Sequence, residues 1–212
     1  NRMPLYNEIA NVPLFFYHPD YKKYQGEQRN VVTQNIDLMP TFLSMHGHSI
    51  PKEVTGKSLI EFLNKDSKQK YSALYGYWGG GINITDGHHT YFHYPENFSQ
   101  QNPDRYQYTL MPTHMRQFFS LEELQSASLH KPFDFTKEVS VLKINRIERK
   151  TDGGYKGFED TKSALYNLAQ DPGQLNSIQD KDLILKYKNL MINEIRQYDP
   201  PKELLKNYFD LI

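Results

Sequence analysis

The stretch NIDLMPTFLSMHGHSIPKEVTGKSLIEFL, residues 35–63, decides how the first part of this 212-residue chain folds. The apolar residues that recur there at helical spacing are Ile36, Leu38, Met39, Phe42, Leu43 and Met45. Such a wide apolar stripe predicts a helix that is buried along much of its length. Pro40 stands early in the pattern, where a missing N–H costs little if the helix begins near Leu38. Gly47 is suited to end the helix.

The segments on either side of this helix predict a layered α/β arrangement. Upstream, residues 12–17 read VPLFFY, an apolar and aromatic-rich run that ends at His18-Pro19 and predicts a buried strand. Because the run is apolar on both faces, we expect a sheet that is covered on both sides. Downstream, residues 57–64 bring four apolar side chains together and predict a short second helix. Strand, helix, helix is the order expected at the edge of an α/β layer.

The chain changes in character after the lysine-rich link 65–70, and residues 71–150 are predicted to be rich in β-strands. Segments with strand-like patterns are 72–77, 81–85, 106–111 and 139–147. Asp86-Gly87 predicts a tight hairpin turn. Ser120 followed by Glu123 has the spacing of a capping box and predicts the start of a short helix. A long helical period then covers 182–198.

Charge and composition exclude several classes of protein. The 25 basic and 25 acidic residues balance, so neither nucleic acid nor an anionic membrane surface is an expected partner. No apolar run approaches the roughly 20 residues of a membrane span. The absence of cysteine excludes thiolate metal sites and fits a reducing compartment, so we expect a cytoplasmic protein. Asn1 is not an initiator methionine, and we expect this chain to be a piece of a longer one.

Four segments, in this order along the chain, resemble the carboxyl-terminal third of the sulfatase family, within the alkaline phosphatase superfamily. They match the family patterns (Y)xExxxxPL, (I)DLxPTxL and GxSL at Tyr6–Leu14, Ile36–Leu43 and Gly56–Leu59, and resemble LYxLxxDPxExxN at Leu165–Asn176, where the Asn comes one residue earlier. Gln174 replaces the commoner acidic residue, in what we interpret as a surface segment. The stretches GYWGGGINITDGHHTYFHYP and YTLMPTHM resemble a bacterial branch that includes phosphonate monoester hydrolases.

The resemblance implies an α/β fold, or α+β for this part alone. Residues 1–70 would complete the edge of an α/β/α catalytic layer, and residues 71–212 would form a small antiparallel sheet packed by the carboxyl-terminal helix. Sulfatases use a nucleophile derived from Cys or Ser, often formylglycine, in a C/S-x-P-x-R motif beside a divalent metal such as Ca or Mn. Neither that motif nor Asp-His-Gly or Asp-Asn-Gly occurs in this sequence.

The resemblance therefore implies no catalytic or metal-binding residue in these 212 positions. We expect the catalytic centre, its metal and any formylglycine to belong to an amino-terminal catalytic part that precedes Asn1 and is the main partner of this chain. Alone, the chain is predicted to be inactive.

Candidate substrate-binding residues are His114 and Arg116 in the sequence MPTHMR. A His and an Arg two residues apart can present donors and positive charge to an anionic ester, although a structural Arg in a surface loop fits the same pattern. His89 and His93 share one face of a predicted strand and are spaced as two zinc ligands, but the sequence offers no third ligand.

Three functions remain open at this point. The resemblance favours part of a hydrolase of sulfate esters that shapes one side of the substrate cleft. A phosphonate or phosphate ester hydrolase of the same superfamily is the alternative within the enzyme class. A non-catalytic α+β interaction or oligomerisation module is the alternative outside it, with a second copy of the chain as one candidate partner, and the 16 tyrosines would suit such an aromatic surface. The coding sequence ahead of Asn1 distinguishes these possibilities.

Overall fold

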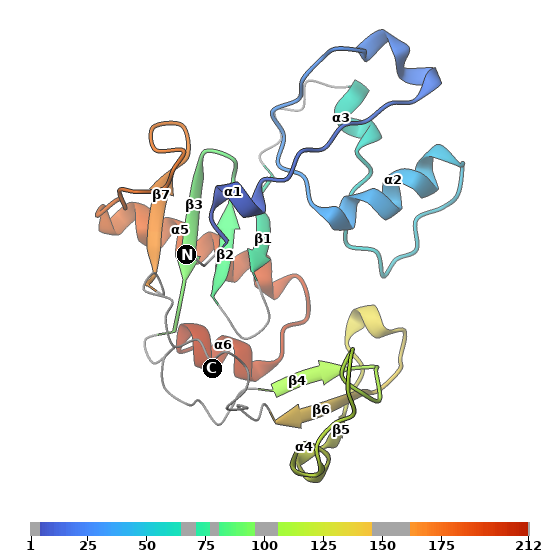
Figure 1. Ribbon diagram of the computed structural model, residues 1–212, viewed down its shortest axis with the longest axis vertical. Coiled ribbons are helices and arrows are strands. Elements are labelled where there is room, and N and C mark those ends of the chain that lie inside the picture. Colours follow the sequence, from blue (N-terminus) through green and yellow to red (C-terminus); the bar gives the residue numbers. More distant parts are fainter. Residues whose placement is uncertain (1–4, 65–70, 77–80, 96–105, 146–161, 212) are drawn as a thin grey trace.

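The computed structural model describes residues 5–64, 71–76, 81–95, 106–145 and 162–211 (Figure 1). Within them lie two antiparallel sheets. One sheet has four strands in the order β1 (Ala73–Gly76), β2 (Ile82–Thr85), β3 (His89–His93) and β7 (Ala164–Asn167). The other has three strands in the order β4 (Tyr106–Thr109), β6 (Val141–Asn145) and β5 (Ser128–His130). Together with the helices, this confirms the predicted α+β class.

The helices lie before, between and after the strands. The α-helices are α1 (Asn7–Ala10), α2 (Leu38–Met45), α3 (Ile60–Asn64), α4 (Leu121–Ser126), α5 (Lys181–Arg196) and α6 (Lys202–Phe209). Three 3₁₀-helices, η1 (Pro19–Tyr24), η2 (Asn35–Asp37) and η3 (Asp134–Thr136), complete the described helical elements. The predicted link 65–70 lies outside the described residues, and the division of the chain near residue 70 stays a prediction.

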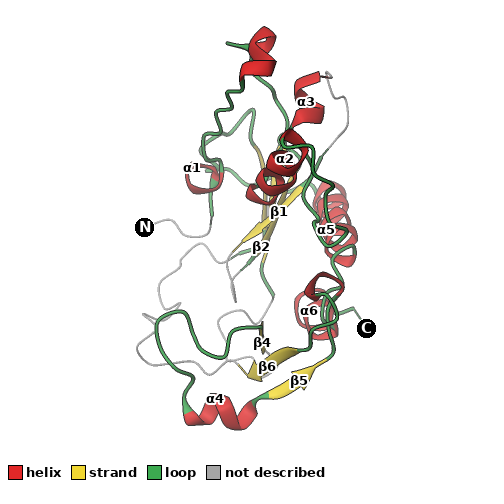
Figure 2. Ribbon diagram, turned by 90° about the vertical axis from the view of Figure 1, so that its right-hand side faces the viewer, coloured by secondary structure: helices red, strands yellow, loops and turns green. Residues whose placement is uncertain are grey.

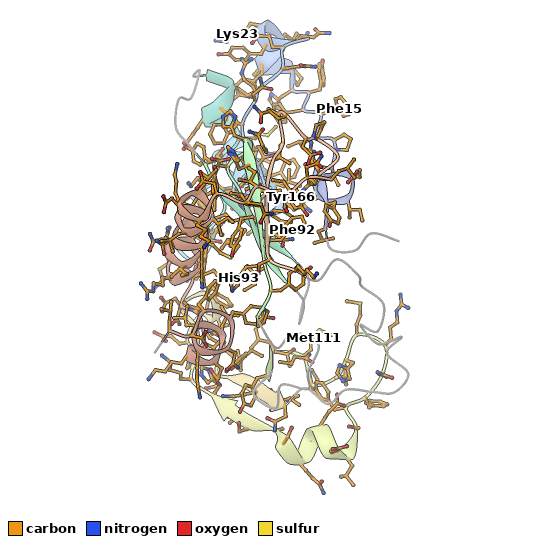
Figure 3. The ribbon with its side chains drawn as sticks, turned by 90° about the vertical axis from the view of Figure 1, so that its left-hand side faces the viewer. Phe15, Lys23, Phe92, His93, Met111 and Tyr166 are labelled. Carbon is orange, nitrogen blue, oxygen red and sulfur yellow. The ribbon has the colours of Figure 1, made fainter. Side chains whose placement is uncertain are left out.

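The four-stranded sheet is covered on one face by α5 and α6 and on the other by the segment around α1 (Figure 2). The buried residues of the core on the α5 side are Ile84, Tyr91, Leu165, Tyr187, Met191, Ile192, Ile195 and Phe209. On the opposite face, the ring of Tyr6 packs edge-on against Phe92 and Tyr166. In Figure 3, His93 lies on the helix side of this sheet, and Phe92 and Tyr166 lie on the other side.

Helix α5 forms where its pattern predicts. The carboxylate of Asp180 caps it by accepting hydrogen bonds from the N–H groups of Asp182 and Leu183, at 3.0 and 3.1 Å. Apolar residues at helical spacing then turn one face toward the sheet, and Met191 is fully buried there. Asp199, with a left-handed φ of 45°, and the two prolines after it end the helix, and the second short helix α6 follows without a preceding prediction.

Two of the motifs near α2 are joined by hydrogen bonds. Asp37 accepts the backbone N–H of Lys57 at 2.9 Å, and the hydroxyl of Thr41 accepts that of Leu59 at 2.8 Å. Gly56 fits because its backbone passes so close to Ile36 that an added Cβ would lie 2.1 Å from the Ile36 carbonyl oxygen. The pattern DLxPT therefore supplies the two side-chain acceptors. The pattern GxSL supplies the two backbone N–H donors and the glycine that lets the two segments pack closely.

Residues 12–17 form no strand, so the prediction of a buried strand there is wrong. The segment has no regular secondary structure, and Phe15 is 92% exposed. An apolar and aromatic run favours extended backbone, but a strand also needs a neighbour whose N–H and C=O groups complete the ladder. None of the described strands pairs with these residues.

The predicted burial of helix α2 is also wrong. The helix begins at Leu38 and ends with Gly47 at a left-handed φ of 69°, as predicted, but only Pro40 and Thr41 are buried. Met39 and Phe42 are each more than half exposed, at 54% and 55%. The apolar face of α2 thus lacks a covering layer among the described residues.

Gln174 is not a surface residue, which corrects the interpretation of the late motif. Its side chain is 1% exposed, and its Oε1 accepts the backbone N–H of Asn7 at 2.6 Å. The motif at 165–176 therefore helps to hold α1 against the sheet. A glutamate at this position offers the same acceptor, which explains why Gln fits.

Candidate functional site

The loop between β4 and α4 carries His114 and Arg116. It lies at the end of the molecule that contains the three-stranded sheet, where Figure 3 labels the neighbouring Met111. The hydroxyl of Thr109, the last residue of β4, accepts the N–H of Met111 at 2.9 Å and starts the turn. Phe119 is buried and anchors the other end of the loop just before α4.

A capping box positions Glu123 at the start of α4. Its Oε2 accepts the backbone N–H of Ser120 at 2.7 Å, and the hydroxyl of Ser120 accepts the N–H of Glu123 at 3.2 Å. This arrangement confirms the capping box predicted from the sequence. The other carboxylate oxygen of Glu123, Oε1, lies 2.8 Å from Nε2 of His114.

Glu123 is ionised throughout the physiological range. The residue is 5% exposed, and burial alone raises the pKa of a carboxyl group. Hydrogen bonds from the Ser120 backbone and from the His114 ring outweigh burial and lower the pKa of Glu123 to about 2. The ring of His114 also packs edge-on against Phe119, with 4.6 Å between ring centres. His114 is thus held on two sides.

Arg116 lies apart from this pair. Its side chain is exposed, and it forms no ion pair with any other described residue. The structure therefore brings His114 together with Glu123, which the sequence analysis did not name as a site residue, and leaves Arg116 open to solvent. The capping-box spacing was the available signal for Glu123, but it predicts a helix start and no histidine partner.

The hairpin at Asp86-Gly87 forms as predicted and positions a partly buried polar network. Gly87 has a φ of 84°, and Oδ1 of Asp86 accepts the backbone N–H groups of His88 and His89 at 2.9 and 2.8 Å. The hydroxyl of Tyr187 on α5 donates to Oδ2 of Asp86 at 2.7 Å and lies 3.0 Å from Nδ1 of His89. Burial, helped by the Asp86 carboxylate, raises the pKa of Tyr187.

His93 uses both ring nitrogens within the fold. Nδ1 lies 3.1 Å from the hydroxyl of Tyr91, and Nε2 forms a hydrogen bond with the backbone carbonyl of Tyr208 near the end of α6. The ring also stacks on Phe209 at 4.5 Å. The predicted common face of His89 and His93 is confirmed, but their hydrogen bonds tie the sheet to α5 and α6 instead of converging on a metal ion.

The described residues offer neither a metal-ligand cluster nor a membrane-spanning helix. No group of three or more His, Cys, Asp or Glu side chains in the described ranges is arranged to hold a metal ion. No helix in the same part of the chain is long and apolar enough to cross a membrane.

A polar cleft of about 360 Å³ lies elsewhere, where the α2 and α3 region meets the end of α5. Its lining includes Gln34, Lys52, Lys57, Tyr71, Glu194 and Tyr198. The ammonium group of Lys57 lies 4.2 Å above the ring of Tyr71, and the hydroxyl of Ser72 donates to Glu194 at 2.8 Å. Neither His114 nor Arg116 lines this cleft.

Comparisons with known proteins point to one family. Residues 1–102 match the family model described as N-sulphoglucosamine sulphohydrolase, C-terminal. A Delta 4,5-hexuronate-2-O-sulfatase of Bacteroides thetaiotaomicron is 37% identical over 71 residues, which are 33% of this chain and 15% of that protein. An N-acetylglucosamine-6-O-sulfatase of the same organism is 30% identical over 78 residues, 35% of this chain and 14% of that protein.

The alignment with a vertebrate relative covers a similarly small share of each chain. Arylsulfatase K of Xenopus laevis is 31% identical over 71 residues, which are 34% of this chain and 13% of that protein. The matched part therefore spans about one seventh of each of these relatives.

Proposed function

We propose that this chain belongs to a hydrolase of sulfate esters, because residues 1–102 match the family model described as N-sulphoglucosamine sulphohydrolase, C-terminal. In this proposal, the first part of the chain completes the edge of the catalytic α/β/α layer, and the loop with His114 and Arg116 forms one side of the substrate cleft. The catalytic centre belongs to a preceding part of the same protein.

The observation that carries this proposal is the exposed apolar surface of residues 12–17 and α2. An extended segment with exposed aromatic side chains is what a strand of a larger sheet presents when its neighbours are absent. The side chains that would be covered by such neighbours are Val12, Leu14, Phe15, Tyr17, Ile36, Met39 and Phe42. Exposed large apolar side chains in such number are typical of surfaces that another part of a protein covers.

The named relatives support a sugar sulfate as the substrate. Two of them are named for sulfate groups on a hexuronate and on N-acetylglucosamine. The exposed guanidinium of Arg116 and the ring of His114 suit the rim of a site for a hydroxylated anion. A divalent metal held by the preceding part would polarise the ester. The residues described in this chain offer no set of ligands for it.

The test begins with the coding sequence ahead of Asn1. A C/S-x-P-x-R motif and an Asp-His-Gly motif there, followed by metal-dependent hydrolysis of 4-nitrophenyl sulfate by the longer protein, are the expected results. The 212-residue chain alone is expected to show no hydrolysis. Hydrolysis by the isolated chain contradicts the proposed location of the catalytic centre.

Two other outcomes would select the alternative functions. A longer protein that hydrolyses 4-nitrophenyl phosphate or a phenylphosphonate ester, but no sulfate ester, is a phosphate or phosphonate hydrolase of the same superfamily. A coding sequence with neither motif leaves the non-catalytic module.

A further inference from the structure

We infer that Glu123 is a positioning residue, which orients the ring of His114 so that its Nδ1 atom accepts a hydrogen bond from a hydroxyl group of a sugar sulfate. The inference rests on the proposed function, because it gives the substrate a place at the loop that carries His114. It extends that function by assigning a sugar hydroxyl as the group that His114 binds and Glu123 as the residue that orients His114.

The proton in the bond between His114 and Glu123 belongs to the histidine. An ionised carboxylate can only accept hydrogen bonds, and Glu123 lies 2.8 Å from Nε2 of His114. Nε2 must therefore carry a hydrogen atom, which in a neutral imidazole leaves Nδ1 as the acceptor. Nδ1 of His114 has no hydrogen-bond partner among the described residues, and the side chain is 25% exposed. Nδ1 is thus the ring nitrogen available to a ligand.

A chain of contacts that ends in the sheet holds the ring. The capping box with Ser120 fixes the carboxylate, and the hydroxyl of Ser126 donates to the backbone carbonyl of Glu123 at 2.7 Å. That same hydroxyl accepts the N–H of Asn145, the last residue of β6, at 3.1 Å. The edge-on contact with Phe119 restricts rotation of the ring. Such support is what a recognition residue on a loop needs in order to keep one orientation.

The charge of Glu123 favours a hydroxyl over a sulfate oxygen as the group that His114 meets. A negative carboxylate directly behind the ring repels an approaching anion but not a neutral hydroxyl. Arg116, which is exposed and has no ion-pair partner among the described residues, is the better group for the anionic part. His114, held by Glu123, therefore binds a sugar hydroxyl, and Arg116 binds the negatively charged sulfate group.

The positioning step is tested on the 212-residue chain by ¹⁵N NMR of the histidine rings. We expect the signals of His114 to show a proton on Nε2, and E123Q to shift both ring nitrogens because the charged acceptor is lost. E122Q is the matched control. Glu122 is exposed on the same helix, and its replacement with Gln removes the same charge as E123Q does. Unchanged His114 ring signals in E123Q, with backbone signals that report a folded chain, overturn the inference whatever the enzyme does.

The substrate step is tested on the longer protein with two substrates. One is the monosaccharide sulfate that it hydrolyses fastest, and the other is 4-nitrophenyl sulfate, which has no sugar hydroxyl. E123Q removes the charged acceptor of the hydrogen bond from Nε2 of His114, so the His114 ring loses its fixed orientation. We therefore expect E123Q to raise KM for the sugar sulfate about tenfold, with little change in kcat. The increase for the aryl sulfate is expected to be clearly smaller. A purely structural role would raise both values alike.

The outcomes separate this inference from the proposed function. H114A and the double variant H114A/E123Q are expected to show the same KM, because Glu123 acts through His114. If H114A raises KM for the sugar sulfate and E123Q does not, the positioning role fails while the substrate rim stands. If aryl sulfates are hydrolysed but no monosaccharide sulfate is, the inference fails and the sulfatase activity stands. If neither class of ester is hydrolysed, the proposed function itself fails.

Discussion

The two sheets of this protein contain similar side chains, yet one has a substantial core and the other has little. The four-stranded sheet and its helices bury eight large residues in one cluster. The buried apolar residues around the three-stranded sheet are Phe119, Phe133, Val141 and Ile144. The large apolar residues that remain exposed there are Leu110, Met111, Met115, Phe118, Leu121, Leu124, Leu129, Phe135 and Val139.

The difference comes from the covering helices. Helix α5 has 16 residues and lays a continuous apolar face on β1, β2 and β3. Helix α4 has only 6 residues and contacts the small sheet mainly at β6. A sheet needs a second layer of comparable size before its apolar face becomes a core. The number of apolar side chains in a sheet therefore does not by itself determine how stable that sheet is.

A cluster of polar groups connects the two regions. The carboxylate of Glu203 on α6 pairs with the ammonium group of Lys143 on β6 and accepts a hydrogen bond from the hydroxyl of Tyr108 on β4 at 2.9 Å. Burial opposes the charge of Glu203, but these two partners outweigh it and lower the pKa of its carboxyl group. The small sheet therefore depends on α6 for part of its support.

The largest expected effect is a core truncation under the four-stranded sheet. Replacing Met191, which is fully buried, with Ala is expected to lower the free energy of unfolding by about 3 kcal/mol, because a cavity replaces packed atoms. Urea unfolding followed by circular dichroism measures the change. The matched control is Leu185→Ala on the exposed side of the same helix, with an expected change below about 0.5 kcal/mol. If Met191→Ala and Leu185→Ala lowered the free energy of unfolding equally, the core under the four-stranded sheet would not be the main source of its stability.

A truncation under the three-stranded sheet is expected to act locally. Ile144 is buried in β6, and its replacement with Ala is expected to cost about 2 kcal/mol. Because the small core is separate, amide hydrogen exchange should become faster in β4, β5 and β6 while β2 and β3 keep their protection. Leu129→Ala, at an exposed position of β5, serves as the control. Equally faster exchange in β2 and β3 would show that both sheets unfold as one unit.

Removal of the connecting charge is expected to have a smaller effect. Glu203→Gln should cost about 1 kcal/mol, since Glu203 and Lys143 are partly exposed and solvent screens their attraction. Hydrogen exchange should rise in β4 and β6, and 1 M NaCl should reduce the difference from the unsubstituted chain. Glu122→Gln removes an equal charge without a described ion pair and is expected to change neither quantity. A salt-independent effect of Glu203→Gln would assign its role to packing.

A further expected effect is a pH dependence that belongs to the four-stranded sheet and is absent at neutral pH. Burial, with a contribution from Lys188, lowers the pKa of His93 below its ordinary value of 6.5, despite the carbonyl of Tyr208. The unfolded chain therefore binds a proton at a higher pH than the folded chain does. Stability is unaffected above about pH 6.5 and falls as the pH decreases below it, by at most about 1.4 kcal/mol per pH unit for one proton.

Two variants isolate this contribution. His93→Gln is expected to flatten the decline of unfolding free energy between pH 6.5 and pH 5, measured by urea unfolding at each pH. His88→Gln, at an exposed position next to the hairpin, should leave the decline unchanged. An equally steep decline in His93→Gln would assign the pH dependence to another group.

Predictions from the sequence succeeded where one short segment contained the whole signal. The capping box at Ser120, the hairpin at Asp86-Gly87 and the long helix α5 all form near their predicted positions. Residues 12–17 and β3 both contain neighbouring aromatic side chains, but β3 pairs with β2 and β7, whereas residues 12–17 pair with no described strand. Composition could not distinguish the two, because a strand is defined by its partner.

The candidate site was predicted only in part for the same reason. His114 and Arg116 were named from residue type and spacing, but the closing of the loop places His114 against Glu123 and leaves Arg116 exposed. The shared face of His89 and His93 follows from strand alternation. Their partners Tyr187 and Tyr208 are 98 and 115 residues away in the chain, beyond the reach of any local pattern.

The amino-acid sequence by itself determined the local features of this protein: where helices begin, where turns form, and which side chains share a face. It also contained the ordered motifs by which the chain resembles sulfatases, three of which lie within the residues 1–102 that match the N-sulphoglucosamine sulphohydrolase C-terminal family model. The tertiary structure alone decided which apolar faces are covered, which ring nitrogen of His114 stays available and what holds each histidine. Local patterns extend over two to four residues, whereas burial and hydrogen-bond partners depend on segments that meet only after the chain has folded.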